Sequence, residues 1–200
     1  MNHNNSIKEL LGDTDIYLLD QIMKGRYGTK DVILDAGCGY GRNLHWFLQN
    51  NNSIYGVDQN EAAINSLKSQ HPSLAERFQQ APVEKLPFGN DTFHHVISSA
   101  VLHFARNTQH FREMIAEMTR VLKPGGSLFI RMTSDIGIED KVQEIADGVY
   151  TIPDGSQRFL LTRHLLADTL QTHPLSFLEP LKTVNVNDIR CMSTLVLAKQ

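Results

Sequence analysis

An apolar strand sequence runs directly into three alternating glycines near residue 37. From Val32 to Asn43 the chain reads VILDAGCGYGRN, so the acid Asp35 is followed by glycines at positions 37, 39 and 41. Glycine adopts the positive φ angles that a sharp turn needs, and it lets a ligand lie against the backbone. The stretch predicts a strand, a ligand-binding turn and then a helix. Phosphate, nucleotide and nucleoside ligands are all compatible with it.

The spacing of these glycines excludes two common nucleotide-binding loops. A dinucleotide-binding GxGxxG loop needs a glycine at position 42, where the chain has Arg42. A P-loop needs lysine and then serine or threonine after Gly41, and the chain continues with Arg42 and Asn43 instead. The remaining pattern, GxGxG after an acid, argues against a nicotinamide oxidoreductase.

Apolar runs alternate with amphipathic stretches from residue 31 onward, as in parallel strands joined by helices. We predict strands over residues 31–36, 53–57, 78–81, 93–99 and 127–133. Predicted helices span residues 40–49, 111–122, 138–149 and 162–170, with another beginning at Asn60. Two final β runs, at residues 177–186 and 191–198, are separated by a turn too short for a parallel crossover, so they should be antiparallel.

A helical segment precedes the first strand. Ser6 and Glu9 have the spacing of a capping box, a second helix start is expected at Asp13 or Thr14, and the segment should end near Gly25.

Composition limits the class of protein and its partners. A chain of 200 residues is long enough for one α/β domain, residues 1–200. Its net charge of −3 gives no reason to expect nucleic acid as a partner. The sequence has neither an apolar run of about 18 residues nor a signal-peptide pattern, so we predict no membrane span and a cytoplasmic location. The sequence does not indicate an oligomeric state.

Asp58 is the second acid placed to meet a ligand. The second predicted strand ends IYGVD, which puts Asp58 about 20 residues beyond the glycines. In parallel sheets the carboxyl ends of neighbouring strands share one crevice. A carboxylate there can accept hydrogen bonds from both ribose hydroxyls, although an acid after a strand can also cap the next helix.

Three further motifs are PVEKLPF at residues 82–88, FHHVISSAVLHF at 93–104 and LKPGG at 122–126. With the glycine loop and Asp58, they make residues 31–134 resemble the class I S-adenosylmethionine-dependent methyltransferases, of the methyltransferase type 11-like branch with an LPF loop before the fourth strand. The resemblance implies S-adenosylmethionine as cofactor and a small molecule as methyl acceptor. It also implies a Rossmann-like methyltransferase fold, α/β, with a mostly parallel seven-stranded sheet, an antiparallel C-terminal strand and helices on both faces.

The same resemblance divides the chain and assigns its site residues. Residues 1–28 would form an N-terminal helical cap, 31–134 the cofactor-binding core, and 135–200 the substrate-side helices and closing strands. The cofactor's methionine part would contact Gly37, Cys38, Gly39, Asp35 and the stretch from Ser98 to Ala100. Its ribose would be held by Asp58 and its adenine flanked by Gln59 and Val83. Arg42 and Asn43 are also predicted to bind the cofactor. The GRN sequence that contains them is similar to that of tellurite-resistance methyltransferases, a match too short to assign a substrate.

Two positions depart from the family pattern. Pro82 stands where an acid often binds the adenine amino group, so that contact must come from the backbone of Val83 and Glu84 or from the Glu84 carboxylate. His94 stands where an acid is common, and we interpret it as structural. Cys38 is either a redox-active thiol or a small side chain that fills a tight loop.

The reaction itself leaves several roles open. Methyl transfer from a sulfonium needs mainly alignment of the reactants and exclusion of water, so a general base is optional. His103, after the fourth strand, is the best-placed candidate base, or else a wall of the pocket. Tyr17 and Arg42 either close over the ligands or only pack. Arg131, Arg163 and His164 are candidates to contact an anionic substrate.

No metal site is predicted, because adjacent His94 and His95 would point to opposite faces of a strand and no HExxH spacing occurs. The alternative to an enzyme is a module that binds S-adenosylmethionine without chemistry, or a regulatory partner of another methyltransferase.

Overall fold

The computed structural model of the protein describes residues 7–200, so the capping box predicted at Ser6 lies outside the described residues. Two short helices, α1 (Ile7–Leu11) and α2 (Ile16–Met23), precede the first strand. The N-cap of α2 is Asp15, whose side chain accepts a hydrogen bond from the Tyr17 N–H, and not Asp13 or Thr14 as predicted. The segment ends near Gly25, which has φ +69°.

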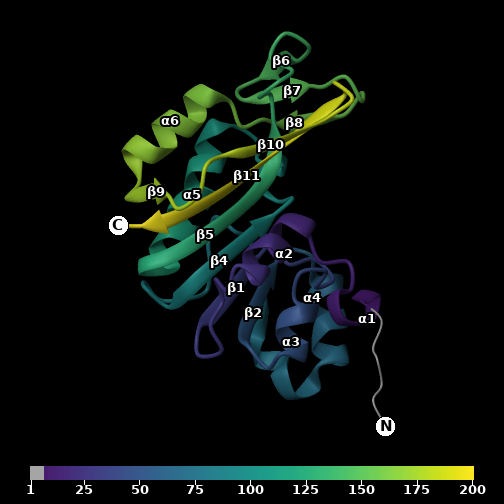
Figure 1. Cartoon of the computed structure of the whole chain (residues 1–200), viewed down its shortest axis with the longest axis vertical. Helices are drawn as coiled ribbons and strands as arrows, with labels where there is room; N and C mark the ends of the chain where they lie inside the picture. The colour runs from purple at the N-terminus through teal and green to yellow at the C-terminus, as the bar shows by residue number, and fades with distance from the viewer. Residues whose placement is uncertain (1–6) are drawn as a thin grey trace.

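The main sheet has the strand order β10-β11-β5-β4-β1-β2-β3 (Figure 1). Strands β1 to β5 run parallel to one another, whereas β11 is antiparallel to both β5 and β10. This confirms the mostly parallel sheet with an antiparallel C-terminal end. A short β9 also pairs with β11, giving eight strands in place of seven. Their bounds are β1 (Val32–Ala36), β2 (Ser53–Asp58), β3 (Phe78–Gln80), β4 (Phe93–Ser99), β5 (Leu122–Ser134), β9 (Leu175–Phe177), β10 (Lys182–Val186) and β11 (Arg190–Lys199).

Helices cover both faces of this sheet because successive strand residues point to opposite sides. On one face, strand residues such as Ile33 pack with α2, α3 (His45–Gln49) and α4 (Glu61–Gln70). On the other face, Leu34 and its neighbours pack with α5 (Thr108–Val121) and α6 (Arg163–Thr172). Two turns of 3₁₀ helix, η1 (Pro72–Arg77) and η2 (Leu102–Phe104), complete the connections.

The predicted helix over residues 138–149 is wrong. This region instead forms a separate antiparallel sheet of β6 (Gln143–Ala146), β7 (Val149–Thr151) and β8 (Gln157–Phe159), which projects from one end of the main sheet (Figure 1). Asp147 and Gly148 form the turn between β6 and β7, and Gly148 has φ +73°. The apolar spacing that suggested a helix is misleading, because every residue of β6 is exposed.

The helix expected from Tyr40 begins five residues later, at His45. The intervening residues continue the turn: the Gly41 N–H donates to the Cys38 carbonyl, and the Leu44 N–H donates to the Gly41 carbonyl. Gly41 has φ +87°, which an α-helix cannot include. The glycine loop is therefore longer than its strand-turn-helix pattern predicts.

Candidate functional site

The glycine loop is fixed onto the end of β2 by its own backbone. The N–H groups of Gly37 and Cys38 both donate to the Val57 carbonyl, at 2.7 and 2.9 Å. The Gly39 N–H donates to Asp58 Oδ2 at 2.8 Å, and Asp58 Oδ1 accepts from the Asn60 N–H at 2.8 Å. The loop and the Asp58 carboxylate therefore meet at one point, as their positions in the sequence predict.

Two of the glycines in the loop have different surroundings. A Cβ on Gly37 would lie 2.4 Å from Val101 Cγ2, so no side chain fits there without a shift. A Cβ on Gly39 would meet no heavy atom of residues 7–200 within 4 Å. Gly37 is thus needed for packing against Val101, the residue that precedes η2, whereas Gly39 leaves open space beside the loop.

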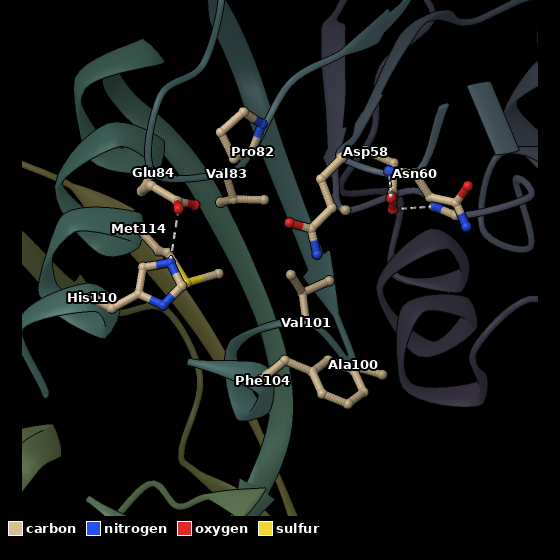
Figure 2. Close-up of a pocket in the computed structure, with 13 residues that line it drawn as sticks. Asp58, Asn60, Pro82, Val83, Glu84, Ala100, Val101, Phe104, His110 and Met114 are labelled. Atoms are coloured by element: carbon tan, nitrogen blue, oxygen red, sulfur yellow. Dashed lines mark hydrogen bonds and ion pairs between the residues drawn. The ribbon is translucent and has the colours of Figure 1, made fainter. Parts of the chain in front are cut away.

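That space belongs to a cavity of about 380 Å³. Figure 2 shows Asp58 and Asn60 on one side of it, opposite Glu84, His110 and Met114. Seven predicted site residues line the cavity: Gly37, Gly39, Asp58, Gln59, Val83, Glu84 and Ala100. The sequence-based prediction did not assign roles here to five others: Asn60, Val101, Phe104, His110 and Met114. Pro82 completes the lining.

His110 and Glu84 lie against each other in the cavity wall. His110 Nε2 lies 3.0 Å from Glu84 Oε1, although the direction of approach departs from that of a hydrogen bond. His110 Nδ1 accepts the Arg106 N–H at 3.1 Å. Burial raises the pKa of Glu84, but its own backbone N–H, His110 and Arg106 outweigh burial and lower the pKa overall. Glu84 is therefore ionised at neutral pH. Met114 fits the buried face of the predicted amphipathic helix over residues 111–122, which hid its place in the cavity, and His110 precedes that helix.

Asp35 lies behind the loop in the end of β1. Its carboxylate is buried, and neither oxygen has a hydrogen-bond partner among the residues described. Burial, with a smaller contribution from Asp58, raises the pKa of Asp35 to about 7, and nearby Arg42 only partly opposes this. The Ser98 hydroxyl, at the end of β4, is also buried without a partner in the described part of the chain. Unsatisfied buried polar groups at a strand end are typical of ligand sites.

Cys38 does not face the cavity. Its thiol is buried, and a Cβ on Gly56 would come within 2.9 Å of Cys38 Sγ. Burial, together with Asp35 and Asp58, raises the pKa of the Cys38 thiol far above its usual value. These surroundings favour the interpretation that Cys38 fills a tight loop over the redox interpretation, because reactive cysteines are exposed and have lowered pKa values.

Tyr17, Arg42 and Asn43 gather around Asp15 rather than in the cavity. Asn43 Oδ1 accepts the Asp15 N–H at 3.0 Å, and Arg42 Nη2 lies 3.8 Å from Asp15 Oδ2. The same Asp15 oxygen accepts from Arg131 Nη1 at 3.0 Å, and the Arg131 guanidinium lies 5.1 Å above the Tyr17 ring. This cluster holds α2 against the glycine loop. The sequence offered no signal for the central role of Asp15 beyond its place near a helix start.

His103 lines a second cavity, of about 240 Å³, which shares Ala100 with the first. The imidazole is buried, with Nδ1 3.3 Å from Thr133 Oγ1. Burial, followed by the charges of Arg158, Arg131 and Arg190, lowers the pKa of His103 to about 4. Arg131 also lines this cavity, whereas Arg163 lies 3.8 Å from Glu139 and His164 lines a different cavity.

Within residues 7–200, no group of three or more His, Cys, Asp or Glu side chains is arranged to hold a metal ion. In the same part of the chain, no helix has the length and apolar character needed to cross a bilayer.

The methyltransferase domain family model matches residues 34–130. A Mycobacterium tuberculosis phthiotriol/phenolphthiotriol dimycocerosates methyltransferase is 32% identical over 96 residues, covering 47% of this chain and 34% of that protein. An uncharacterized methyltransferase of Bacillus subtilis is 36% identical over 109 residues, covering 54% of this chain and 42% of that protein. The matched region thus spans between about a third and two-fifths of these relatives' lengths.

Two solved structures have the same fold. A S-adenosylmethionine-dependent methyltransferase from Methanosarcina mazei aligns with a TM-score of 0.72 and 19% identity, covering 89% of this chain and 96% of that one. The second is a Burkholderia thailandensis 1,6-didemethyltoxoflavin N1-methyltransferase, solved with 1,6-didemethyltoxoflavin and S-adenosylhomocysteine. It aligns with a TM-score of 0.71 and 20% identity, covering 94% of this chain and 80% of that one. Residues 34–130 therefore match the methyltransferase domain family, and the chain has the fold of S-adenosylmethionine-dependent methyltransferases.

Proposed function

We propose that this protein binds S-adenosylmethionine in the 380 Å³ cavity beside the glycine loop and transfers its methyl group to a small molecule. The observation that carries the proposal is the Asp58 carboxylate, held at the cavity by the N–H groups of Gly39 and Asn60. Each oxygen accepts only one of these bonds, so both keep lone pairs for the two ribose hydroxyls. The cavity volume lies within the range of roughly 300–1,000 Å³ typical of small-molecule sites.

The residues around the cavity fit the two ends of this cofactor. Val83 gives an apolar contact for the adenine. The ionised Glu84 carboxylate can accept a hydrogen bond from the adenine amino group, a contact that the family often makes through an acid at the position of Pro82. At the other end, the Asp35 carboxylate, which has no hydrogen-bond partner among residues 7–200, suits the cofactor's ammonium. That ammonium would stabilise the charged form of Asp35. The open space at Gly39 leaves room for the part of the cofactor that joins its adenine end to its amino-acid end.

The bound cofactor supplies an electrophilic methyl group on a positively charged sulfur. What this chain must do is hold the acceptor in line and exclude water. Ala100 directly follows β4 and Phe104 ends η2, and both line the cavity where the acceptor would approach. His103 is poorly suited to remove a proton, because a group with a pKa of about 4 is a weak base at neutral pH. The low pKa of His103 is therefore more consistent with an acceptor atom that is already nucleophilic.

Calorimetric titration with S-adenosylhomocysteine tests cofactor binding, with NADH as the matched negative ligand. A ligand at 100 times its Kd adds about 2.7 kcal/mol to the free energy of unfolding, so thermal shifts of several degrees are expected as well. Absence of binding at millimolar concentration would overturn the proposal. Binding without methyl transfer to any of a panel of thiols, amines, phenols and carboxylates would instead support the non-catalytic module.

A further inference from the structure

Three arginines from different elements converge on the second cavity. Arg131 comes from β5, Arg158 from β8, and Arg190 from the start of β11, where the small sheet and the β10–β11 hairpin lie at the same end of the molecule (Figure 1). We name this cavity the arginine cleft. It holds about 240 Å³, and its remaining wall includes Ala100 and His103.

Two of these guanidinium groups form no ion pair among the described residues, although they do act on one nearby carboxylate. Hydrogen bonds from Ser156, and after them the charges of Arg190 and Arg158, lower the pKa of Asp154. Arg131 is paired with Asp15 at 3.0 Å. Among residues 7–200, neither Arg158 nor Arg190 has a carboxylate oxygen within 4.0 Å, and Arg158 donates only to the Gln157 carbonyl at 2.7 Å. The one acid that lines the cleft, Asp154, uses one oxygen to accept the Ser156 N–H at 2.9 Å and the Ser156 hydroxyl at 2.6 Å.

The charges act on the same point inside the cleft. All three guanidinium groups contribute to the lowered pKa of the buried His103 imidazole, which remains neutral at pH 7. Like charges gathered around a buried neutral ring oppose one another, and an anion among them would relieve that repulsion. Arginine is also the side chain best suited to bind carboxylate and phosphate oxygens through two N–H groups.

The arginine cleft adjoins the cofactor cavity. Ala100 lines both, and its N–H donates to the Arg131 carbonyl at 2.8 Å, which fixes the residue between them. Phe104, in the lining of the cofactor cavity, lies 5.4 Å beneath the Arg158 guanidinium and packs on the His103 ring with centroids 4.4 Å apart. A molecule in the cleft is therefore separated from the cofactor only by this short wall.

We propose that the arginine cleft binds an anionic group, a carboxylate or a phosphate, of the methyl acceptor, with Arg158 and Arg190 as its principal contacts. This assignment rests on the proposed function, because it places the acceptor beside the cofactor cavity. The anion is held at Arg158 and Arg190, and the atom to be methylated points past Ala100. The acceptor is small, because the cleft has room for little more than the charged group and a ring.

The test measures binding of benzoate, inorganic phosphate and the neutral analogue benzamide, at low ionic strength, with and without saturating S-adenosylhomocysteine. We expect at least one anion to bind ten times or more tightly than benzamide. Arg158→Gln and Arg190→Gln should each raise the Kd of that anion at least fivefold, while the Kd of S-adenosylhomocysteine stays unchanged. Whichever anion binds more tightly identifies the charged group as carboxylate or phosphate.

Arg112→Gln is the matched control, because Arg112 pairs with Asp168 on the surface and does not line the cleft. It should leave the affinities for both anions unchanged. Equal affinity for benzamide and both anions, or wild-type anion affinity in the Arg158→Gln/Arg190→Gln double variant, would overturn the inference. So would a parallel loss of S-adenosylhomocysteine affinity, since the cleft would then serve the cofactor's own carboxylate. If S-adenosylhomocysteine does not bind at all, the proposed function fails, and the titrations without it still decide whether the cleft binds anions.

Discussion

Asp58 accepts the Gly39 N–H at 2.8 Å, and this bond joins the two sequence motifs that define the site. The N–H groups of Gly37 and Cys38 already donate to the Val57 carbonyl, so the loop has few backbone donors left for a ligand. The polar recognition of a nucleoside must then come largely from Asp58 itself. In this respect the loop differs from phosphate-binding loops, in which the N–H groups face the ligand.

Asp58→Ala should weaken S-adenosylhomocysteine binding by about 1.5–3 kcal/mol, because bonds from ribose hydroxyls to a charged acceptor are lost. This corresponds to a Kd raised about tenfold to about 150-fold. Calorimetric titration measures the change. Glu113→Ala removes an exposed acid from α5 and serves as the control with unchanged affinity. Wild-type affinity in Asp58→Ala would show that the ribose lies elsewhere.

Gly39→Ala and Gly37→Ala should fail in different ways. A methyl group on Gly39 meets open space, so the variant should fold, with a cost of about 1–2 kcal/mol for alanine at φ +52°. It should lose S-adenosylhomocysteine affinity, because the methyl group enters the cavity. Gly37→Ala places its methyl group 2.4 Å from Val101 and should lose stability first.

Thermal unfolding with and without S-adenosylhomocysteine separates these two effects. Gly37→Ala/Val101→Ala, which removes the clashing side chain, should recover part of the lost stability. A Gly39→Ala variant that binds the ligand as tightly as wild type would contradict the proposed position of the cofactor.

Asp35→Asn should stabilise the ligand-free protein at alkaline pH. The folded-state pKa of Asp35, about 7, exceeds its ordinary value of 3.8, so this group favours folding below pH 3.8 and loses that contribution as pH rises through 7. The asparagine variant carries no charge and escapes this loss. Urea unfolding should show its advantage over wild type growing by about 2 kcal/mol between pH 5 and pH 8. S-adenosylhomocysteine binding should weaken in the same variant. If the difference in free energy of unfolding between Asp35→Asn and wild type does not change with pH, the Asp35 carboxylate is already paired in the ligand-free protein.

His103 should stay neutral from pH 5 to pH 8, because burial and the three arginines lower its pKa to about 4. Since the folded-state pKa lies below the unfolded value of 6.5, the stability that His103 contributes is present above pH 6.5 and lost as pH falls through 4. NMR titration of the imidazole measures the pKa of His103 directly. A pH–rate profile with a rise near pH 6.5 that disappears in His103→Gln would contradict this low pKa and would make His103 the general base.

The parallel strands and the two acids could be predicted from the sequence because both depend on local patterns. Apolar runs with helical spacing between them specify a parallel sheet, and Asp35 and Asp58 fall at strand ends by simple counting. Residues such as His110 and Met114 could not be assigned, because their spacing on α5 is equally that of a core-facing helix. Their exposure to the cavity depends on what packs opposite them, which no local pattern records.

The small sheet of β6, β7 and β8 and the cluster around Asp15 could not be predicted for the same reason: both depend on contacts between residues far apart in the sequence. Residues 138–149 have an apolar spacing that fits a helix, but the turn at Gly148 and contact with Phe159 decide in favour of strands. A Cβ on Gly148 would lie 2.3 Å from the Phe159 ring, a constraint that arises only once β8 is in place. Asp15, likewise, meets Arg131 across 116 residues of sequence.

The crystal structure of this protein with S-adenosylhomocysteine tests the central claim most directly. The account predicts both ribose hydroxyls on the Asp58 carboxylate, the adenine beside Val83 and Glu84, and the sulfur facing Ala100 and the arginine cleft. A ligand bound outside the 380 Å³ cavity, or bound within it with the ribose away from Asp58, would contradict the account.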